Sequence, residues 1–143
     1  MIRNYMVNKI FIDTGAFIAI NDKADQYHTI AVEFLNELIS KGNYHLYTSN
    51  FVVSETYTRI LYRCNPATAI KFLDIINRIN IKLIYSDKNT EESCVKDFLK
   101  KYKNEKISYV DAVSFQIMKD NNITDAFTFD KHFRIAGFNS LPL

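Results

Sequence analysis

Short runs of β-branched and aromatic residues alternate with longer segments of helical periodicity along most of the chain, and this alternation restricts the fold more than any other feature. The strand-like runs are residues 9–13, 44–49, 81–86 and 125–129, with a weaker run at 138–143. Apolar residues at helical spacing predict helices at 27–42, 52–63, 67–79, 90–102 and 108–122. Repeated strand–helix–strand units favour a parallel sheet covered by helices on both faces. The sequence therefore predicts an α/β fold, a three-layer α/β/α sandwich with a mainly parallel central sheet.

Glycine and proline mark the ends of the predicted helices. Gly42 ends the helix at 27–42, and Pro66 separates the next two helices along the chain. The apolar face predicted for the helix at 27–42 comprises Ile30, Phe34, Leu35 and Leu38.

The chain has the length and composition of one globular domain, which we place at residues 1–143. Of its 143 residues 48% are hydrophobic, and only three are Gly and two Pro. The formal charge of +2 is too small to identify a nucleic-acid binder. Cys64 and Cys94 lack the spacing of a zinc site or a disulfide framework. Neither a signal peptide nor a membrane-spanning stretch is recognisable, so we expect a soluble, cytoplasmic protein.

Asp13 lies inside an apolar run, KIFIDTGAFIAI at residues 9–20, in which DTGA spells the signature of an aspartic protease. Such a protease pairs two Asp carboxylates in an all-β fold, and a chain with one motif must dimerise to assemble the pair. The helical content predicted for this chain contradicts that fold. Asp13 can instead cap a short helix that reaches Ile20, or it can bind a metal ion where the first strand ends.

Three further carboxylates lie close to predicted strand ends or helix beginnings, and each has a local role as an alternative. Glu55 can pair with Arg59 one helical turn later. Asp111 follows Ser108 at the spacing of a capping box, and Asp130 can cap the turn that begins with DKHF. Taken one at a time, these acids do not identify a function.

As a set, the acids are more informative, because the carboxyl ends of parallel strands meet at one edge of a sheet. The acids expected to meet there are Asp13, Glu55, Asp111 and Asp130. Two like charges about 6 Å apart at an effective dielectric constant of about 20 repel by roughly 2.8 kcal/mol. Such a cluster must bind cations or take up protons, and carboxylate ligands select hard divalent ions such as Mg²⁺ or Mn²⁺.

Other polar residues near these acids are secondary candidates. Thr14 and Thr128 lie within two residues of a strand-end acid and can orient a carboxylate or a water molecule. The basic residues that flank the acids and can hold phosphates are Arg59, Arg63, Lys106, Lys131 and Arg134, although a scattered, solvated basic face is the more frequent pattern. No histidine has zinc-site spacing, and we interpret as surface or packing residues His28, His45 and His132.

Four segments carry a resemblance to a known family. IFIDTGAFIAI, SNFVVSETYTRI, ISYVDAVSFQIMKDNNI and AFTFDKHFRIAGF are together similar to the PIN-domain family of metal-dependent ribonucleases, which includes the VapC-type toxins of toxin–antitoxin pairs. The resemblance implies hydrolysis of RNA with one or two Mg²⁺ or Mn²⁺ ions. It assigns the metal site to Asp13, Glu55, Asp111 and Asp130. Gly15 departs from the family pattern, in which Ser or Asn often follows the Asp-Thr pair.

The resemblance implies an endoribonuclease that acts on RNA and, in the toxin role, has a small antitoxin protein as its partner. A non-catalytic RNA-binding or scaffold module with the same fold is the alternative. The complete acidic set favours the enzyme, because a binding module has no use for four carboxylates that repel one another. A phospho-accepting receiver domain is disfavoured, since the chain lacks the acidic pair that precedes its acceptor Asp. The sequence leaves open whether the protein forms a homodimer.

Overall fold

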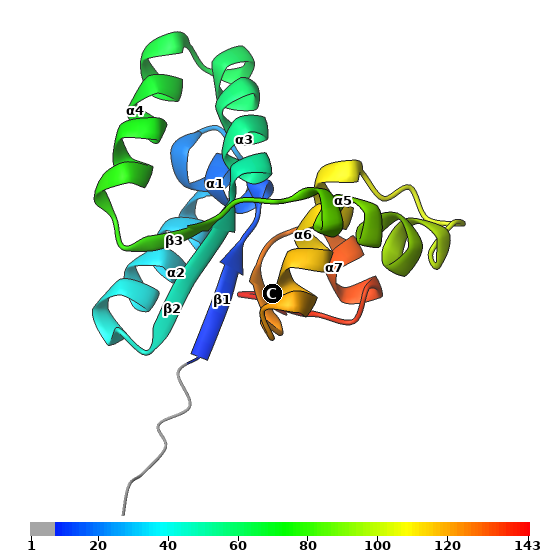
Figure 1. Cartoon of the computed structure of the whole chain (residues 1–143). Helices are drawn as coiled ribbons and strands as arrows, with labels where there is room; N and C mark the ends of the chain where they lie inside the picture. The colour runs from blue at the N-terminus through cyan, green and yellow to red at the C-terminus, as the bar shows by residue number, and fades with distance from the viewer. Residues whose placement is uncertain (1–7) are drawn as a thin grey trace, which may run out of the picture.

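Five parallel strands form a single sheet in the order β3-β2-β1-β4-β5 (Figure 1). The structure, a computed structural model, describes residues 8–143. The start of the chain, on which the expectation of no signal peptide rests, lies outside the described residues. The strands are β1 (Asn8–Ile12), β2 (Tyr44–Ser49), β3 (Ile81–Ile84), β4 (Asp125–Phe127) and β5 (Asn139–Leu141). The predicted parallel sheet is confirmed, and four of the strands end one or two residues before their predicted ends.

Helices occupy most of the segments between the strands. They are α1 (Thr14–Asn21), α2 (His28–Lys41), α3 (Asn50–Arg63), α4 (Pro66–Arg78), α5 (Lys88–Cys94), the π-helical η1 (Val95–Lys100), α6 (Tyr109–Asp120) and α7 (Lys131–Ile135). Local signals set the boundaries. The Asn65 side chain caps α4, whose first residue is Pro66. Gly42, with φ of 60°, ends α2 in the left-handed conformation that glycine adopts at little cost.

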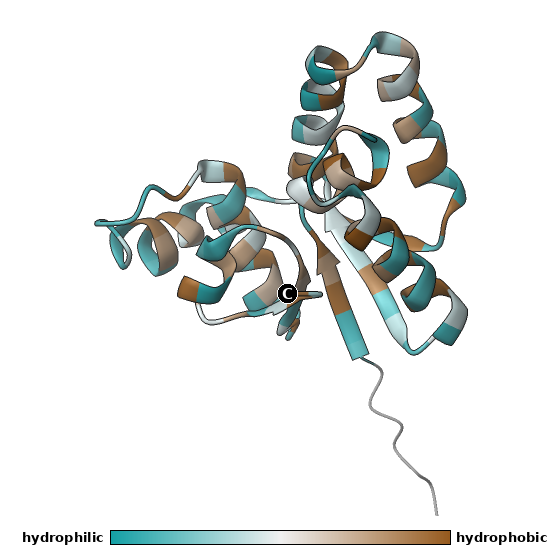
Figure 2. Cartoon of the chain, turned by 180° about the vertical axis from the view of Figure 1, so that it is seen from behind, coloured by the Kyte–Doolittle hydropathy of each residue, from teal (hydrophilic) through white to brown (hydrophobic). Residues whose placement is uncertain are grey.

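The strand order places the helices in two layers. From β1 to β2 to β3 the chain moves in one direction across the sheet, and it then returns past β1 to β4 and β5. Because crossovers between parallel strands are right-handed, this reversal puts α1–α4 on one face and α5–α7 on the other. The views agree with this arrangement, since α2 lies behind the sheet in Figure 1 and in front of it in Figure 2. The predicted three-layer sandwich is therefore confirmed.

The strand order reverses at β1, which lies between β2 and β4. In open parallel sheets, ligands bind outside the carboxyl ends of the strands at such a reversal. Asp13 directly follows β1, and Asp130 follows β4 after two intervening residues. The topology thus selects one edge of the sheet, between β1 and β4, as the place to look for a site.

Strand β1 and helix α6 form the centre of the core. Ile10, Phe11 and Ile12 have no exposed surface, and in Figure 2 β1 changes from teal at its start to brown along the rest of its length. On α6 every residue from 112 to 118 is buried. Because close-packed elements leave little room for movement, the acids that follow β1 and begin α6 are held on rigid supports.

One predicted face of α2 needs correction. The side chains that reach the core are Ala31, Phe34, Leu35 and Leu38. They form an i, i+3, i+4, i+7 stripe, which is the pattern of a helix packed along one side. Ile30 was expected on this face, but it lies outside the stripe and is 39% exposed. The placement of Ile30 on the core face is therefore wrong by one residue.

Candidate metal centre

A cavity of about 630 Å³ opens at the carboxyl end of the sheet. All of the predicted acids line it, namely Asp13, Glu55, Asp111 and Asp130. They come from the end of β1, the second turn of α3, the first turn of α6 and the cap of α7. The tertiary structure thus brings together carboxylates that are far apart in the sequence, as the parallel sheet predicts.

Asp13 lies at the bottom of this cavity and is 3% exposed. Its main-chain N–H donates to the Phe127 carbonyl at 3.1 Å, which ties the end of β1 to β4. Its Oδ1 accepts from the Thr14 N–H at 2.7 Å, and its Oδ2 accepts from the Thr128 hydroxyl at 2.9 Å. Burial raises the pKa of Asp13 to about 6, with smaller contributions from the charges of Asp130 and Glu55 and opposition from these two hydrogen bonds.

Asp111 faces Asp13 from the first turn of α6. Its N–H donates to the Ser108 hydroxyl at 3.1 Å, so that Ser108 caps the helix. Burial raises the pKa of Asp111 to about 8, and the charges of Asp13 and Asp130 contribute next. A carboxyl that holds its proton near neutral pH in the metal-free protein is one that gains most from a cation, because the cation replaces the proton and offsets the repulsion.

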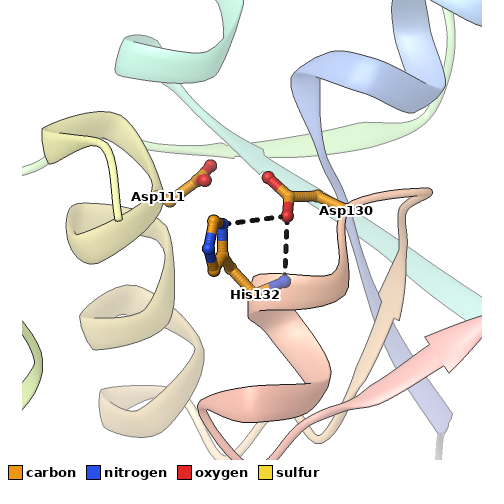
Figure 3. Close-up of side chains that lie close together, drawn as sticks. All are labelled: Asp111, Asp130 and His132. Carbon is orange, nitrogen blue, oxygen red and sulfur yellow. Dashed lines mark hydrogen bonds and ion pairs between the residues drawn. The ribbon is translucent and has the colours of Figure 1, made fainter. Parts of the chain in front are cut away.

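Asp130 and His132 complete a close group with Asp111, in which one ligand atom from each residue lies within 4.8 Å of the others. Figure 3 shows the His132 ring between the two carboxylates. The Asp130 Oδ1 accepts from the His132 N–H at 2.9 Å, which caps α7, and lies 3.1 Å from the His132 Nδ1. His132, which the sequence suggested was a surface or packing residue, thus lines the cavity beside two of the acids.

Glu55 lies at the side of the cavity with its carboxylate partly exposed. Its Oε1 is 3.4 Å from the Arg59 Nη1, which is the local pair expected one helical turn apart. Arg63 is held by two other acids, since its Nη1 lies 3.2 Å from the Asp25 Oδ2 and 3.9 Å from the Asp22 Oδ2. Partly exposed pairs such as these contribute little to stability, but they fix where the arginines stand.

The basic candidates separate into two groups. Arg59, Arg63, Lys106 and Lys131 line the cavity, and among the described residues neither lysine forms an ion pair. Arg134 does not join them. It lines a different cavity, and its Nη2 donates to the Leu143 main-chain oxygen at 2.9 Å.

The local roles considered for the four acids all exist, and none of them excludes the cluster. Asp13 and Asp130 cap α1 and α7, and Asp111 follows a Ser cap. Each cap uses one carboxylate oxygen or a main-chain N–H. A carboxylate oxygen that accepts one hydrogen bond keeps a second lone pair, and so a helix cap can also be a ligand.

A comparison with protein families finds a PIN domain at residues 10–139. The chain belongs to the PIN-domain family. It is 30% identical over 129 residues to the 23S rRNA-specific endonuclease VapC20 of Mycobacterium tuberculosis, a match that covers 90% of this chain and 95% of the relative. It is 25% identical over 125 residues to a VapC ribonuclease of Archaeoglobus fulgidus, covering 87% of this chain and 78% of the relative.

Solved structures resemble this PIN domain over nearly its whole length. The crystal structure of VapC20, described as a sarcin-ricin loop cleaving toxin, matches with a TM-score of 0.80 at 29% identity, covering 90% of this chain and 95% of that one. VapBC2 from Rickettsia felis shares the fold at a TM-score of 0.65 and 15% identity, covering 92% of this chain and 96% of that one. The parallel sheet and the family together exclude the aspartic-protease interpretation of DTGA.

PIN nucleases generally use divalent metal ions, and the residues of this PIN domain fit such an ion. The donors in the cavity are mostly carboxylate oxygens, which are ligands for hard cations. Thr14 also lines the cavity, and its hydroxyl oxygen is fully buried without a hydrogen-bond partner among the described residues.

Thr128 has the orienting role that the sequence predicts. Its hydroxyl donates to the Asp13 Oδ2 and accepts from the Asp130 N–H at 3.0 Å. One side chain therefore sets the relative positions of two acids. Thr14 reaches Asp13 through its main-chain N–H rather than through its hydroxyl.

Sequence reasoning missed the aromatic wall of the cavity. Tyr27 and Phe129 both line it, and their rings stack with centroids 4.3 Å apart and planes 2° apart. Tyr27 precedes α2, and Phe129 directly precedes Asp130. The position of Phe129 next to a candidate ligand was a usable signal, but no local pattern pairs it with Tyr27. Along the whole described range, none of the helices is long and apolar enough to cross a membrane.

Proposed function

We propose that this protein is an endoribonuclease that hydrolyses RNA phosphodiester bonds with Mg²⁺ or Mn²⁺, and that it acts as the toxin of a toxin–antitoxin pair. The observation that carries the proposal is the cluster formed by the buried Asp13 with the half-buried Asp111 and Asp130 at the reversal of the strand order. In the described part of the chain, no Lys or Arg pairs with any of these three acids. A cluster without its own counter-charge is stabilised by a cation from outside or by protons.

The choice of RNA as substrate is supported by the relatives. VapC20 is named as a 23S rRNA-specific endonuclease and is described as a toxin, and the Archaeoglobus relative is named as a ribonuclease. The basic side chains around the cavity suit a phosphodiester backbone. We propose further that residues 1–143 act as one domain in the cytoplasm, with a small antitoxin protein as the partner that blocks the cavity.

Each group in the cavity has a role in this proposal. Asp13, Asp111 and Asp130 hold the divalent ion, with Glu55 completing the set directly or through water. When bound, the ion supplies Lewis-acid stabilisation of the charge that builds on the phosphate and makes water more acidic. Thr128 keeps Asp13 and Asp130 in register through its hydroxyl.

The remaining residues position the RNA. Lys106 and Lys131, which have no protein carboxylate to pair with among the described residues, are available to bind phosphates flanking the scissile one. Arg59 and Arg63 stand at the same cavity but share their charge with acids, so we assign them weaker phosphate contacts. Tyr27 and Phe129 offer apolar surface against which a nucleobase can pack.

The proposal is tested with the purified protein and total RNA. We expect cleavage with Mg²⁺ or Mn²⁺ that stops with EDTA and returns when excess metal is added. Asp111→Asn should remove it, because the variant loses an anionic ligand but keeps the side-chain shape. Asp125→Asn, at the opposite end of the sheet, is the matched control and should cleave normally.

Two outcomes would count against the enzyme. Cleavage that survives exhaustive chelation would contradict the metal mechanism. RNA binding without cleavage in either metal, from a protein that shows a metal-induced rise in melting temperature, would favour the non-catalytic RNA-binding module.

A further inference from the structure

Among the described residues that line the cavity, His132 is the one histidine, and its position is well fixed. Its side chain is only 14% exposed. Its main-chain N–H is fixed by the Asp130 cap, and the following residue, Phe133, is fully buried and packs edge-on against Phe115 of α6 at 4.8 Å. The ring therefore cannot swing far from the two aspartates.

The position of the imidazole matches that of a metal ligand. Adjacent ligands of an octahedral ion at about 2.1 Å are about 3.0 Å apart. The His132 Nδ1 and the Asp130 Oδ1 are 3.1 Å apart, and Asp111 completes a group whose atoms lie within 4.8 Å of one another. One ion can therefore contact all three side chains without a large rearrangement (Figure 3).

The other ring nitrogen also faces a carboxylate, at a separation longer than a hydrogen bond. The His132 Nε2 lies 3.8 Å from the Glu105 Oε2. Histidine ligands generally donate their second N–H to a carboxylate, which fixes the tautomer and makes the ligating nitrogen a better donor. In the tautomer with its proton on Nε2, the N–H faces Glu105. The lone pair of Nδ1 then faces the side of Asp130.

We propose that the His132 Nδ1 is a ligand of the ion held by Asp111 and Asp130, with Glu105 orienting the ring, so that the site prefers Mn²⁺ or a similar transition-metal ion to Mg²⁺. This inference rests on the proposed metal site and adds the nitrogen ligand to it. Imidazole nitrogen binds transition-metal ions well, whereas Mg²⁺ favours oxygen ligands and keeps its water.

Pulsed electron paramagnetic resonance of the Mn²⁺-loaded protein tests the nitrogen directly. We expect the spin-echo modulation of a nitrogen bound to Mn²⁺, and we expect it to change to the ¹⁵N pattern when the protein is made with ¹⁵N-labelled histidine. The labelled protein has an unchanged sequence, so folding is not in question. His132→Gln should lose the signal, and His45→Gln, at an exposed histidine on β2, should keep it.

Calorimetric titration tests the preference. His132→Gln should weaken Mn²⁺ binding by at least about tenfold and Mg²⁺ binding by much less, and Glu105→Gln should weaken Mn²⁺ binding by roughly tenfold, as loss of a histidine's second partner does. Mn²⁺ binding that needs Asp111 but shows no histidine nitrogen, with equal effects of His132→Gln on both metals, would overturn this inference and leave the proposed function intact. Absence of Mn²⁺ and Mg²⁺ binding altogether would overturn both.

Discussion

Aspartates at the two ends of the parallel sheet have opposite surroundings. At the amino end of β4, Asp125 accepts from the Asn139 Nδ2 at 2.9 Å and from the Tyr44 hydroxyl at 3.3 Å. These neutral donors satisfy it, and the cavity beside it holds Arg134. At the carboxyl end, Asp13 and Asp111 are surrounded by further carboxylates, and the pKa values of both are raised.

The difference follows from the direction of the strands. In a parallel sheet every strand delivers the residue after it to the same edge, and the helices that follow begin there too. Strand-end and cap positions favour Asp, so acids collect at the carboxyl end without any sequence-local reason for them to meet. At the amino end the same residue type is a structural hydrogen-bond acceptor. Within one sheet, Asp13 at the carboxyl end belongs to the candidate site, whereas Asp125 at the amino end makes an ordinary structural contact.

The largest expected contrast is between Asp13→Asn and Asp125→Asn. Loss of an anionic ligand should lower RNA cleavage by at least about 100-fold, because metal stabilisation of the reacting phosphate is worth several kcal/mol and each 1.4 kcal/mol is about tenfold. The rise in melting temperature on adding Mg²⁺ or Mn²⁺ should shrink as well. Asp125→Asn should retain both. Cleavage assays and thermal melts on both variants measure this, and a fully active Asp13→Asn would make Asp13 a helix cap only.

The second contrast concerns the stability of the metal-free protein. Asp13→Asn keeps an oxygen for the Thr14 N–H and removes a buried charge, so it should leave the protein as stable or more stable, by about 1–3 kcal/mol at pH 8. Asp125→Asn should destabilise slightly, because it removes a charged acceptor from two donors. Urea unfolding in EDTA measures both. A large loss of stability in Asp13→Asn would show that the charge is compensated within the protein.

The pH dependence of metal-free stability gives the third contrast. The pKa of Asp13 rises from 3.8 to about 6 and that of Asp111 from 3.8 to about 8 on folding. The folded state then binds more protons than the unfolded state, so this stabilisation is complete below about pH 4 and is lost as the pH rises through 6 and 8. Urea midpoints in EDTA from pH 5 to 9 should fall in the wild type and fall less in Asp111→Asn. A rising midpoint would contradict the raised pKa values.

The two lysines that line the cavity, Lys106 and Lys131, should give a smaller effect, visible in the salt dependence of RNA affinity. Each phosphate contact contributes about −0.7 to the log–log slope for single strands. Lys106→Gln with Lys131→Gln should make the slope less negative by about 1.4. Arg134→Gln is the control, because Arg134 lines another cavity. The slopes are measured as RNA binding by proteins that also carry Asp111→Asn, so that the RNA is not cleaved. An equal effect from Arg134 would mean that the whole basic face contributes without preference for the cavity.

The smallest effect is expected at Gly15, where the family often has Ser or Asn. A Cβ at this position would lie 3.8 Å from the Asp13 Oδ2, which is an ordinary contact. Gly15 is in the first turn of α1, where a side chain lowers the conformational entropy of the unfolded chain. Gly15→Ser should therefore change stability by no more than about 0.5 kcal/mol, in the stabilising direction. A clear fall in melting temperature would show that the space beside Asp13 is needed for something else.

Much of this molecule is readable from local sequence, because strand and helix patterns and caps depend on neighbouring residues. The alternation of β-branched runs and helical spacing predicts the parallel sandwich, and Pro66 and Gly42 mark real helix boundaries. The four acids were found because parallel topology has a simple rule for where strand ends go. Ile30 was misplaced because apolar spacing alone does not show whether Ile30 or its neighbour Ala31 begins the core-facing stripe of α2. In the structure Ala31 is the buried one.

Only the tertiary structure decided which side chains face the cluster. His132 and Arg134 lie on the same short helix, yet His132 lines the cavity of the acids and Arg134 lines another. Tyr27 meets Phe129 across about a hundred residues of chain. The raised pKa values of Asp13 and Asp111 also depend on burial and on charges from distant segments. Residue spacing determines neighbours along a helix or strand, but burial and long-range electrostatics arise from packing, which no local pattern encodes.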